Sequence, residues 1–183
     1  MSEAKVLAPD GRILSSVNNY PHMSFNFGPT LHKWIEKSYP SLNKTITMSG
    51  DRAIAQCYNH IIMPHASDED KKTQVVWGIK DFIYRFGRKP EGMWIPETAV
   101  NIRTLEVMAK EGISFTILAK EQCQAVEYDG IWHEPTEEEP DVTLPYLCVL
   151  PSGRTINIIF YHSEFSHNMA FGSLLDNGDK LYE

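Results

Sequence analysis

Two amphipathic helices alternate with short apolar segments between residues 68 and 118, and this order constrains the fold more than any other feature of the sequence. Helices are predicted at residues 68–85 and 101–111, because apolar side chains recur there at helical spacing. Residues 92–95 and 114–118 are short and apolar, which is typical of buried strands. Strands that alternate with helices indicate parallel β/α units.

The N-terminal part of the chain extends this pattern. Residues 23–27 are predicted as a short strand, and a helix is predicted from Pro29 to about Lys37, with Pro40 ending the unit. Before them the chain opens on a loop-like stretch around Pro9-Asp10-Gly11. The pattern therefore predicts one more β/α unit ahead of the helix at residues 68–85.

The C-terminal part is less regular. Residues 120–145 show no clear pattern, and we interpret their acidic run, Glu137–Glu139, as a solvated loop. Three elements are then predicted: a hairpin of residues 146–150 and 155–161, a helix at about residues 164–175, and a helical turn at residues 179–183. About three or four β/α units are visible, whereas a closed eight-fold barrel takes about 250 residues. We therefore expect part of a barrel, with both ends cut.

Charge and composition exclude several classes of function. The 183-residue chain carries a net charge of −7 and no basic stripe, so a nucleic-acid binder is not expected. No apolar run approaches the roughly 20 residues of a membrane span, and the N-terminus lacks the apolar core of a secretory signal. The three cysteines are too few and too far apart for a disulfide framework. We therefore predict a cytoplasmic protein with reduced, structural thiols.

Glu97 is the strongest candidate for a catalytic side chain. It directly follows the predicted strand at residues 92–95, and catalytic groups in β/α folds collect at the carboxyl ends of strands. Trp94 offers an aromatic face on which a sugar ring can stack. A carboxylate beside an aromatic ring suits the nucleophile of a glycosidase. The alternative is that Glu97 caps the following helix, and spacing alone leaves both interpretations open.

The histidines give weaker signals. His60 can hydrogen-bond a sugar hydroxyl or orient a carboxylate, or it can be a structural histidine. His162, Glu164 and His167 fit no recognised ligand spacing, so no metal site and no cofactor are predicted. Phosphate-loop, dinucleotide-binding and α/β-hydrolase motifs are also absent from the sequence.

The nine residues Gly-Met-Trp-Ile-Pro-Glu-Thr-Ala-Val at positions 92–100 resemble the segment that holds the catalytic nucleophile in glycoside hydrolase family 57. This family is the α-amylase, branching-enzyme and glucanotransferase group. Further segments resemble the family in order along nearly the whole chain, at residues 24–31, 56–64, 77–82 and 85–94. Several ordered motifs are more specific than any one of them.

The resemblance implies a partial (β/α)7 barrel, with parallel strands, flanking helices and one hairpin, in a single domain of residues 1–183. It implies a retaining mechanism on α-glucan or oligosaccharide substrates, in which Glu97 forms the covalent glycosyl-enzyme. His60, Trp94 and Asn26 are then expected to bind the substrate.

Two parts of the family pattern are missing from this sequence. The opening H-x-Q-P strand is absent, and so is the T-D-G-E-like segment with the acid/base aspartate. We therefore expect an incomplete catalytic barrel that is inactive alone, with the acid/base residue beyond Glu183 in the remainder of the parent polypeptide. Glu164 and Asp176 are the nearest other carboxylates, and neither is expected to replace it.

Two other interpretations stay open at this point. A metal-dependent polysaccharide deacetylase uses a related barrel, but it needs an Asp-His-His site that the sequence does not offer. A non-catalytic carbohydrate-binding fragment would keep the fold without turnover. The sequence alone does not decide between hydrolysis, branching and transfer.

Overall fold

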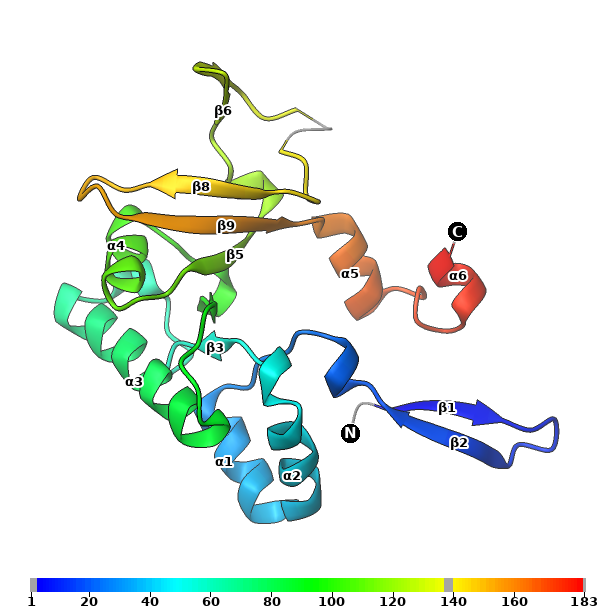
Figure 1. The fold of residues 1–183 in the computed structure, drawn as a ribbon. Helices are drawn as coiled ribbons and strands as arrows, with labels where there is room; N and C mark the ends of the chain where they lie inside the picture. The colour runs from blue at the N-terminus through cyan, green and yellow to red at the C-terminus, as the bar shows by residue number, and fades with distance from the viewer. Residues whose placement is uncertain (1–2, 137–139, 183) are drawn as a thin grey trace. The chain divides into compact units, whose positions relative to one another are not determined.

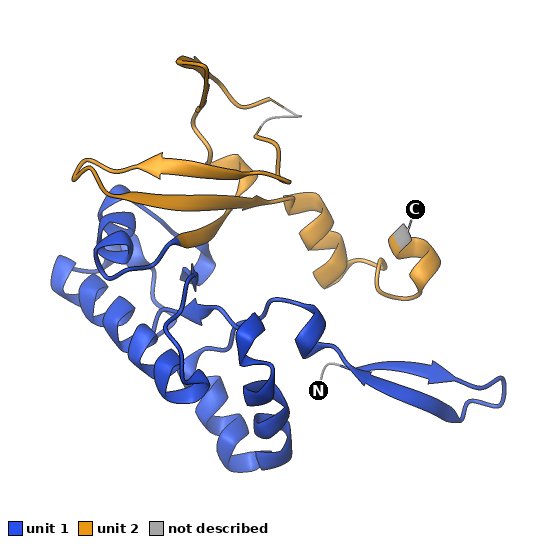
Figure 2. Ribbon diagram, in the orientation of Figure 1, with its two compact units in different colours: residues 1–114 blue, residues 115–183 orange. Residues whose placement is uncertain are grey.

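The computed structural model describes residues 3–136 and 140–182 of the chain. The chain divides into two compact units, residues 1–114 and residues 115–183 (Figure 2). The single domain expected over residues 1–183 stays a prediction. The loop expected at Glu137–Glu139 lies outside the described residues.

The first unit combines a hairpin, four α-helices and a parallel strand pair, linked by short 3-10 turns (Figure 1). Its helices and strands are β1 (Glu3–Leu7), β2 (Ile13–Asn18), α1 (Pro29–Ser38), α2 (Pro40–Met48), β3 (Ala55–Gln56), α3 (Asp68–Phe86), β4 (Met93–Trp94) and α4 (Ile102–Lys110). The 3-10 turns are η1 (Tyr20–His22), η2 (Gly50–Arg52), η3 (Met63–His65) and η4 (Pro96–Thr98).

Three extended segments of this unit run parallel to one another. Strand β3 pairs with β4, and Phe25 forms a parallel bridge to Ala53, just before β3. Helices α1 and α2 connect the first segment to the second, and α3 connects the second to the third. Parallel pairing of segments joined by helices is therefore confirmed within this unit, whereas the expected partial (β/α)7 barrel stays a prediction. The strand expected at residues 23–27 is wrong in extent, because only the single bridge at Phe25 forms there.

The helix boundaries follow local signals in the sequence. Helix α3 begins after Ser67, whose Oγ accepts a hydrogen bond from the Asp70 amide at 3.1 Å, and ends at Gly87 with φ 68°. Helix α4 is capped by Asn101. Helix α1 ends at Ser38, before Pro40 as expected, but Pro40 is also the first residue of α2, a helix that the sequence analysis did not predict. Proline lacks only an amide that has no helical partner at that position, so it also favours the start of a helix.

Helix α3 packs closely against β3. A Cβ atom on Gly78 would lie 2.2 Å from the main-chain oxygen of Gln56, so only glycine allows this approach. The Arg88 guanidinium, beyond the helix end, donates hydrogen bonds to the main-chain oxygens of Gly50 and Ala53 and lies 4.9 Å from the Phe82 ring centre. These contacts join the helix to the chain segment that leads into β3.

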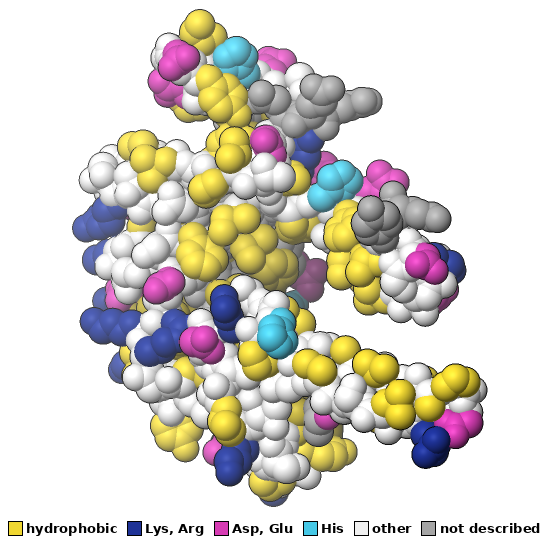
Figure 3. Space-filling model, turned by 45° about the vertical axis from the view of Figure 1, so that its right-hand side comes forward, with side chains coloured by type: hydrophobic (Ala, Val, Ile, Leu, Met, Phe, Trp, Pro, Cys, Tyr) yellow, Lys and Arg dark blue, Asp and Glu magenta, His cyan; other side chains and the backbone are white. Residues whose placement is uncertain are grey.

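The N-terminal segment is a hairpin and not the loop-like stretch expected from the sequence. Strands β1 and β2 pair antiparallel around a turn that contains Gly11, with φ 82°. Every residue of β1 and nearly all of β2 are exposed. Hydrophobic side chains lie along this hairpin, which projects at the lower right in Figure 3. Neither strand has a buried face, so the sequence carries no alternating pattern that reveals the hairpin.

The second unit is built on a three-stranded sheet in the order β5-β9-β8. Its elements are β5 (Phe115–Ala119), η5 (Lys120–Gln122), β6 (Val126–Tyr128), β7 (Ile131–His133), β8 (Pro145–Val149), β9 (Thr155–Tyr161), α5 (Ser163–Phe171) and α6 (Gly178–Tyr182). Strand β5 pairs with β9 in parallel, and β8 pairs with β9 antiparallel. Ile156, Ile158 and Phe160 alternate with exposed residues of β9 and are buried.

The predicted hairpin of residues 146–150 and 155–161 is confirmed by β8 and β9. The segment without a clear pattern contains a second hairpin, β6–β7, which turns at Asp129 and Gly130, both with positive φ. Asp-Gly is a strong hairpin signal that the sequence analysis did not use, so this hairpin was missed. The helix expected to reach about residue 175 ends earlier, at Phe171.

Gly78→Ala tests the close packing of α3 on β3. The added methyl group meets main-chain atoms that cannot move aside, so the free energy of unfolding is expected to fall by about 1–3 kcal/mol. Urea-induced unfolding measures this change. The matched control is Gly178→Ala, because a Cβ atom on Gly178 meets nothing within 4 Å. Equal stability of the two variants would contradict this account of the packing.

Candidate active site

Strands β3 and β4 pair in parallel, so the chain segments that follow them leave the pair at the same edge. Gln56 lies opposite Trp94 in the register, and the Cys57 amide donates a hydrogen bond to the Trp94 oxygen at 3.4 Å. His60 follows β3 by four residues, and Glu97 follows β4 by three. Both side chains therefore lie beyond the carboxyl ends of parallel strands, where β/α folds collect functional groups.

Glu97 and His60 meet at this edge. The Oε1 atom of Glu97 lies 2.7 Å from Nε2 of His60. An ionised carboxylate only accepts hydrogen bonds, so the imidazole Nε2–H donates. The side chain of Glu97 is 66% exposed and that of His60 is 56% exposed, so their contact contributes at most about 1 kcal/mol to stability. Its importance therefore lies in geometry, because a carboxylate and a hydrogen-bond donor are held together in reach of a ligand.

The backbone at Glu97 is strained. Glu97 has φ 55° and Thr98 has φ 50°, both in the left-handed region that non-glycine residues rarely adopt. Ile95 and Pro96 are fully buried on one side of Glu97, and Thr98 is 8% exposed on the other. Buried neighbours thus hold the exposed carboxylate in an unfavourable backbone conformation. Strain of this kind clusters at functional sites, where it costs about 1–3 kcal/mol per residue.

His60 is at the centre of a tight turn. The amide of Ile61 donates a hydrogen bond to the oxygen of Asn59 at 3.0 Å, which closes a three-residue turn around His60. The Asn59 amide is in turn bound by the Gln74 side chain, at 2.6 Å. The main chain on both sides of His60 is therefore fixed, although its side chain is exposed.

The other two predicted site residues lie nearby in the chain. Trp94 ends β4 and is half-buried, and Asn26 directly follows the bridge at Phe25 and is also half-buried. Of the four predicted residues, the hydrogen bonds of the described part of the chain join only His60 to Glu97. The roles of Trp94 and Asn26 stay predictions.

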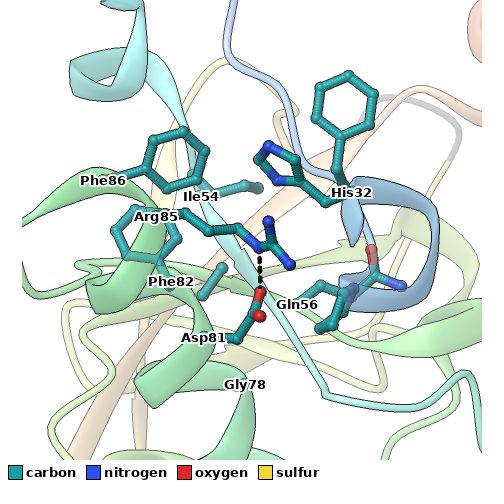
Figure 4. Close-up of a pocket in the computed structure, with 11 residues that line it drawn as sticks. His32, Ile54, Gln56, Gly78, Asp81, Phe82, Arg85 and Phe86 are labelled. Atoms are coloured by element: carbon teal, nitrogen blue, oxygen red, sulfur yellow. Dashed lines mark hydrogen bonds and ion pairs between the residues drawn. The ribbon is translucent and has the colours of Figure 1, made fainter. Parts of the chain in front are cut away.

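A separate cavity lies between α1 and α3 (Figure 4). Its volume of about 10 Å³ is only about that of one water probe, so it is too small for a sugar. His32, 1% exposed, lines it, and Arg85 beside it pairs with Asp81 at 2.8 Å. Burial, together with the positive charge of Arg85, lowers the pKa of His32. We interpret this cavity as part of the helix packing.

Two further observations concern metal binding and the reactivity of a buried cysteine. Among the described residues, no three His, Cys, Asp or Glu side chains group so that they could hold a metal ion. Burial raises the pKa of the Cys57 thiol to about 12, so this cysteine is not a nucleophile at neutral pH.

No helix in the described ranges is both long enough and apolar enough to cross a membrane.

Sequence reasoning missed the residues that support the site. Gln74, Gly78 and Arg88 fix the segments around β3, yet none was singled out. Gly78 carried a usable signal, because a glycine inside a helical pattern destabilises the helix and so points to a special backbone or packing requirement. Gln74 and Arg88 carried no such signal, since polar residues at these positions look like ordinary surface residues.

The comparisons with known proteins agree with the resemblance seen in the sequence. The family model described as Glycosyl hydrolase family 57 matches residues 11–181. Alpha-amylase 1 of Dictyoglomus thermophilum is 25% identical over 101 residues, which is 52% of this chain and 15% of the amylase.

Several solved structures share the fold. A 4-alpha-glucanotransferase from Thermococcus litoralis superposes with a TM-score of 0.66 at 18% identity, covering 84% of this chain and 24% of that one. An exo-type maltose-forming amylase from Pyrococcus sp. ST04 gives a TM-score of 0.69 at 18% identity, with 85% and 26% covered. The chain thus spans about a quarter or less of the length of these relatives.

The left-handed backbone at Glu97 predicts an unusual order of stability for two substitutions. Glu97→Gly and Glu97→Ala both remove the contact with His60, but only glycine adopts φ 55° without strain. The glycine variant is therefore expected to be more stable than the alanine variant by about 1 kcal/mol. Urea unfolding compares the two, and an alanine variant as stable as the glycine one would show that no strain is stored there.

The lowered pKa of His32 predicts a dependence of stability on pH. The unfolded chain takes up a proton on this histidine near pH 6.5, whereas the folded chain does so only at lower pH. The contribution of His32 to the free energy of unfolding is therefore fully present above about pH 6.5, and it is lost as the pH is lowered below that value. His32→Gln is expected to flatten this fall in urea titrations between about pH 7 and 5. The control is His22→Gln, at an exposed position, and an unchanged slope in His32→Gln would contradict the prediction.

Proposed function

The chain belongs to glycosyl hydrolase family 57, and from this membership we propose that it is part of a retaining glycoside hydrolase or transglycosidase that acts on α-glucans. The observation that carries the proposal is the contact of Glu97 with His60 at the carboxyl ends of a parallel strand pair. A carboxylate in this position, exposed and oriented by a donor, suits attack on a sugar.

In the proposed mechanism Glu97 is the nucleophile. Its carboxylate attacks the anomeric carbon of the bound sugar, the bond to the leaving oxygen breaks, and a covalent glycosyl ester forms. Water or an acceptor sugar then displaces Glu97 and restores the carboxylate. The His60 Nε2–H holds Oε1, which leaves the second oxygen, Oε2, to attack.

A retaining mechanism needs a second carboxyl group about 5–5.5 Å from the nucleophile, to protonate the leaving oxygen and later activate water. Because the chain spans only about a quarter of the two solved structures, we assign this group to another part of the parent polypeptide. The two units described above would then be portions of a (β/α)7 barrel that the whole polypeptide completes.

The remaining predicted residues would bind the sugar beside Glu97. Trp94 supplies an aromatic face for stacking, and Asn26 supplies an amide that can both donate and accept hydrogen bonds. The three cysteines are free, which supports a reducing, cytoplasmic compartment.

Glu97→Gln tests the proposed role directly, in the complete polypeptide that carries these residues. The amide cannot form the glycosyl ester, so kcat/KM on maltooligosaccharides is expected to fall by about 10⁴-fold or more. Product release from the oligosaccharide, followed by chromatography, gives the rate.

The matched control is Glu69→Gln, which makes the same change at an exposed carboxylate in the first turn of α3. This variant is expected to keep the activity of the unmodified protein. Activity retained in Glu97→Gln would reject the nucleophile assignment. A complete polypeptide that binds maltooligosaccharides without any turnover would instead indicate a non-catalytic binding protein.

A further inference from the structure

The loop that carries His60 is attached to α3 at several points. Gly78 of α3 lies against the main-chain oxygen of Gln56, and Trp77 packs edge-to-face on Tyr58 with ring centres 5.4 Å apart. At the far end of the loop, the Lys71 ammonium group donates a hydrogen bond to the oxygen of Ala66. Helix α3, which packs on β3 in Figure 1, thus supports the loop from Gln56 to Ala66.

Gln74 makes the two central attachments. Its main-chain oxygen accepts a hydrogen bond from the Tyr58 amide at 3.1 Å. Its side-chain Oε1 accepts one from the Asn59 amide at 2.6 Å. Gln74 is only 9% exposed, so water does not readily replace the side-chain bond. One buried residue therefore binds two successive amides of the loop, directly before His60.

The second of these bonds leads to the catalytic candidate. Asn59, held by Gln74, supplies the oxygen that closes the turn around His60, and His60 contacts Glu97. The exposed pair of His60 and Glu97 has too little interaction energy of its own to fix two side chains. Its geometry must come from the main chain on each side, and on the His60 side that support starts at Gln74.

We propose that Gln74 is a positioning residue, whose side chain holds the Asn59–Ile61 turn so that His60 stays in contact with Glu97. This inference deepens the proposed function and rests on it in one respect, because positioning matters for turnover only if Glu97 is the nucleophile. The geometric part of the proposal, that Gln74 keeps His60 in contact with Glu97, does not depend on the role of Glu97 in turnover.

Gln74→Met tests this contact in the full chain, because methionine has a similar volume but replaces the amide oxygen that binds the Asn59 amide with a weakly accepting thioether sulfur. Hydrogen exchange of that amide, followed by NMR, is expected to become about tenfold faster. The Tyr58 amide is an internal control, since its bond to the main-chain oxygen of residue 74 is kept. In protein with ¹⁵N-labelled histidine, the His60 Nε2 resonance is expected to move toward its position in Glu97→Gln.

Two further variants sharpen the test. Gln74→Glu keeps an oxygen acceptor at the same place, so it is expected to retain slow Asn59 exchange and the original His60 resonance. Ile46→Val changes a fully buried side chain of α2 and is expected to leave the His60 resonance unmoved. The proposal is overturned if His60 is unaffected in Gln74→Met, if Gln74→Glu behaves like Gln74→Met, or if Ile46→Val has the same effect.

Kinetics of the complete polypeptide separate this inference from the proposed function. Gln74→Met is expected to lower kcat by up to about 10²-fold with little change in KM, because a displaced nucleophile slows the chemical step. If Glu97→Gln stays active, the proposed function fails, while the NMR result still decides whether Gln74 holds His60. If Glu97→Gln is inactive and Gln74→Met keeps full kcat, the positioning role in turnover is rejected.

Discussion

The parallel pairing of β3 and β4 is the constraint on which the site depends. Each strand is only two residues long, and so short a pair is not stable by itself. Gly78 brings α3 against the main chain at Gln56, and Arg88 fixes the segment that leads into β3. Helix packing therefore holds two short strands in register, and the register brings His60 and Glu97 to the same edge.

The site itself weakens the fold. Glu97 and Thr98 adopt left-handed backbone conformations that cost free energy, and the contact of Glu97 with His60 is too exposed to offset that cost. The buried neighbours Ile95 and Pro96 maintain the arrangement. Such a balance is expected where a carboxylate must stand in a fixed direction toward a ligand, because function and stability then impose different requirements on one segment.

Much of the helical structure could be predicted from the sequence, whereas the support of the site could not. Helices α3 and α4 have buried faces, so the periodicity of their apolar residues located both. The β1–β2 hairpin has no buried face and left no pattern. Glu97 was proposed from its motif and strand position and His60 from its motif, but their contact depends on the register of β3 and β4, which is a tertiary property. Gln74 resembles any polar helix residue until the loop it binds is visible.

Covalent trapping tests the central claim, that Glu97 bonds to a sugar during turnover. A glucosyl fluoride with a second fluorine on the sugar ring slows breakdown of a glycosyl-enzyme intermediate, so the complete polypeptide can be digested and examined by mass spectrometry. The account predicts one sugar on the peptide that contains residues 92–100, attached at Glu97, and none in the glutamine variant. A sugar attached to another carboxylate would contradict it.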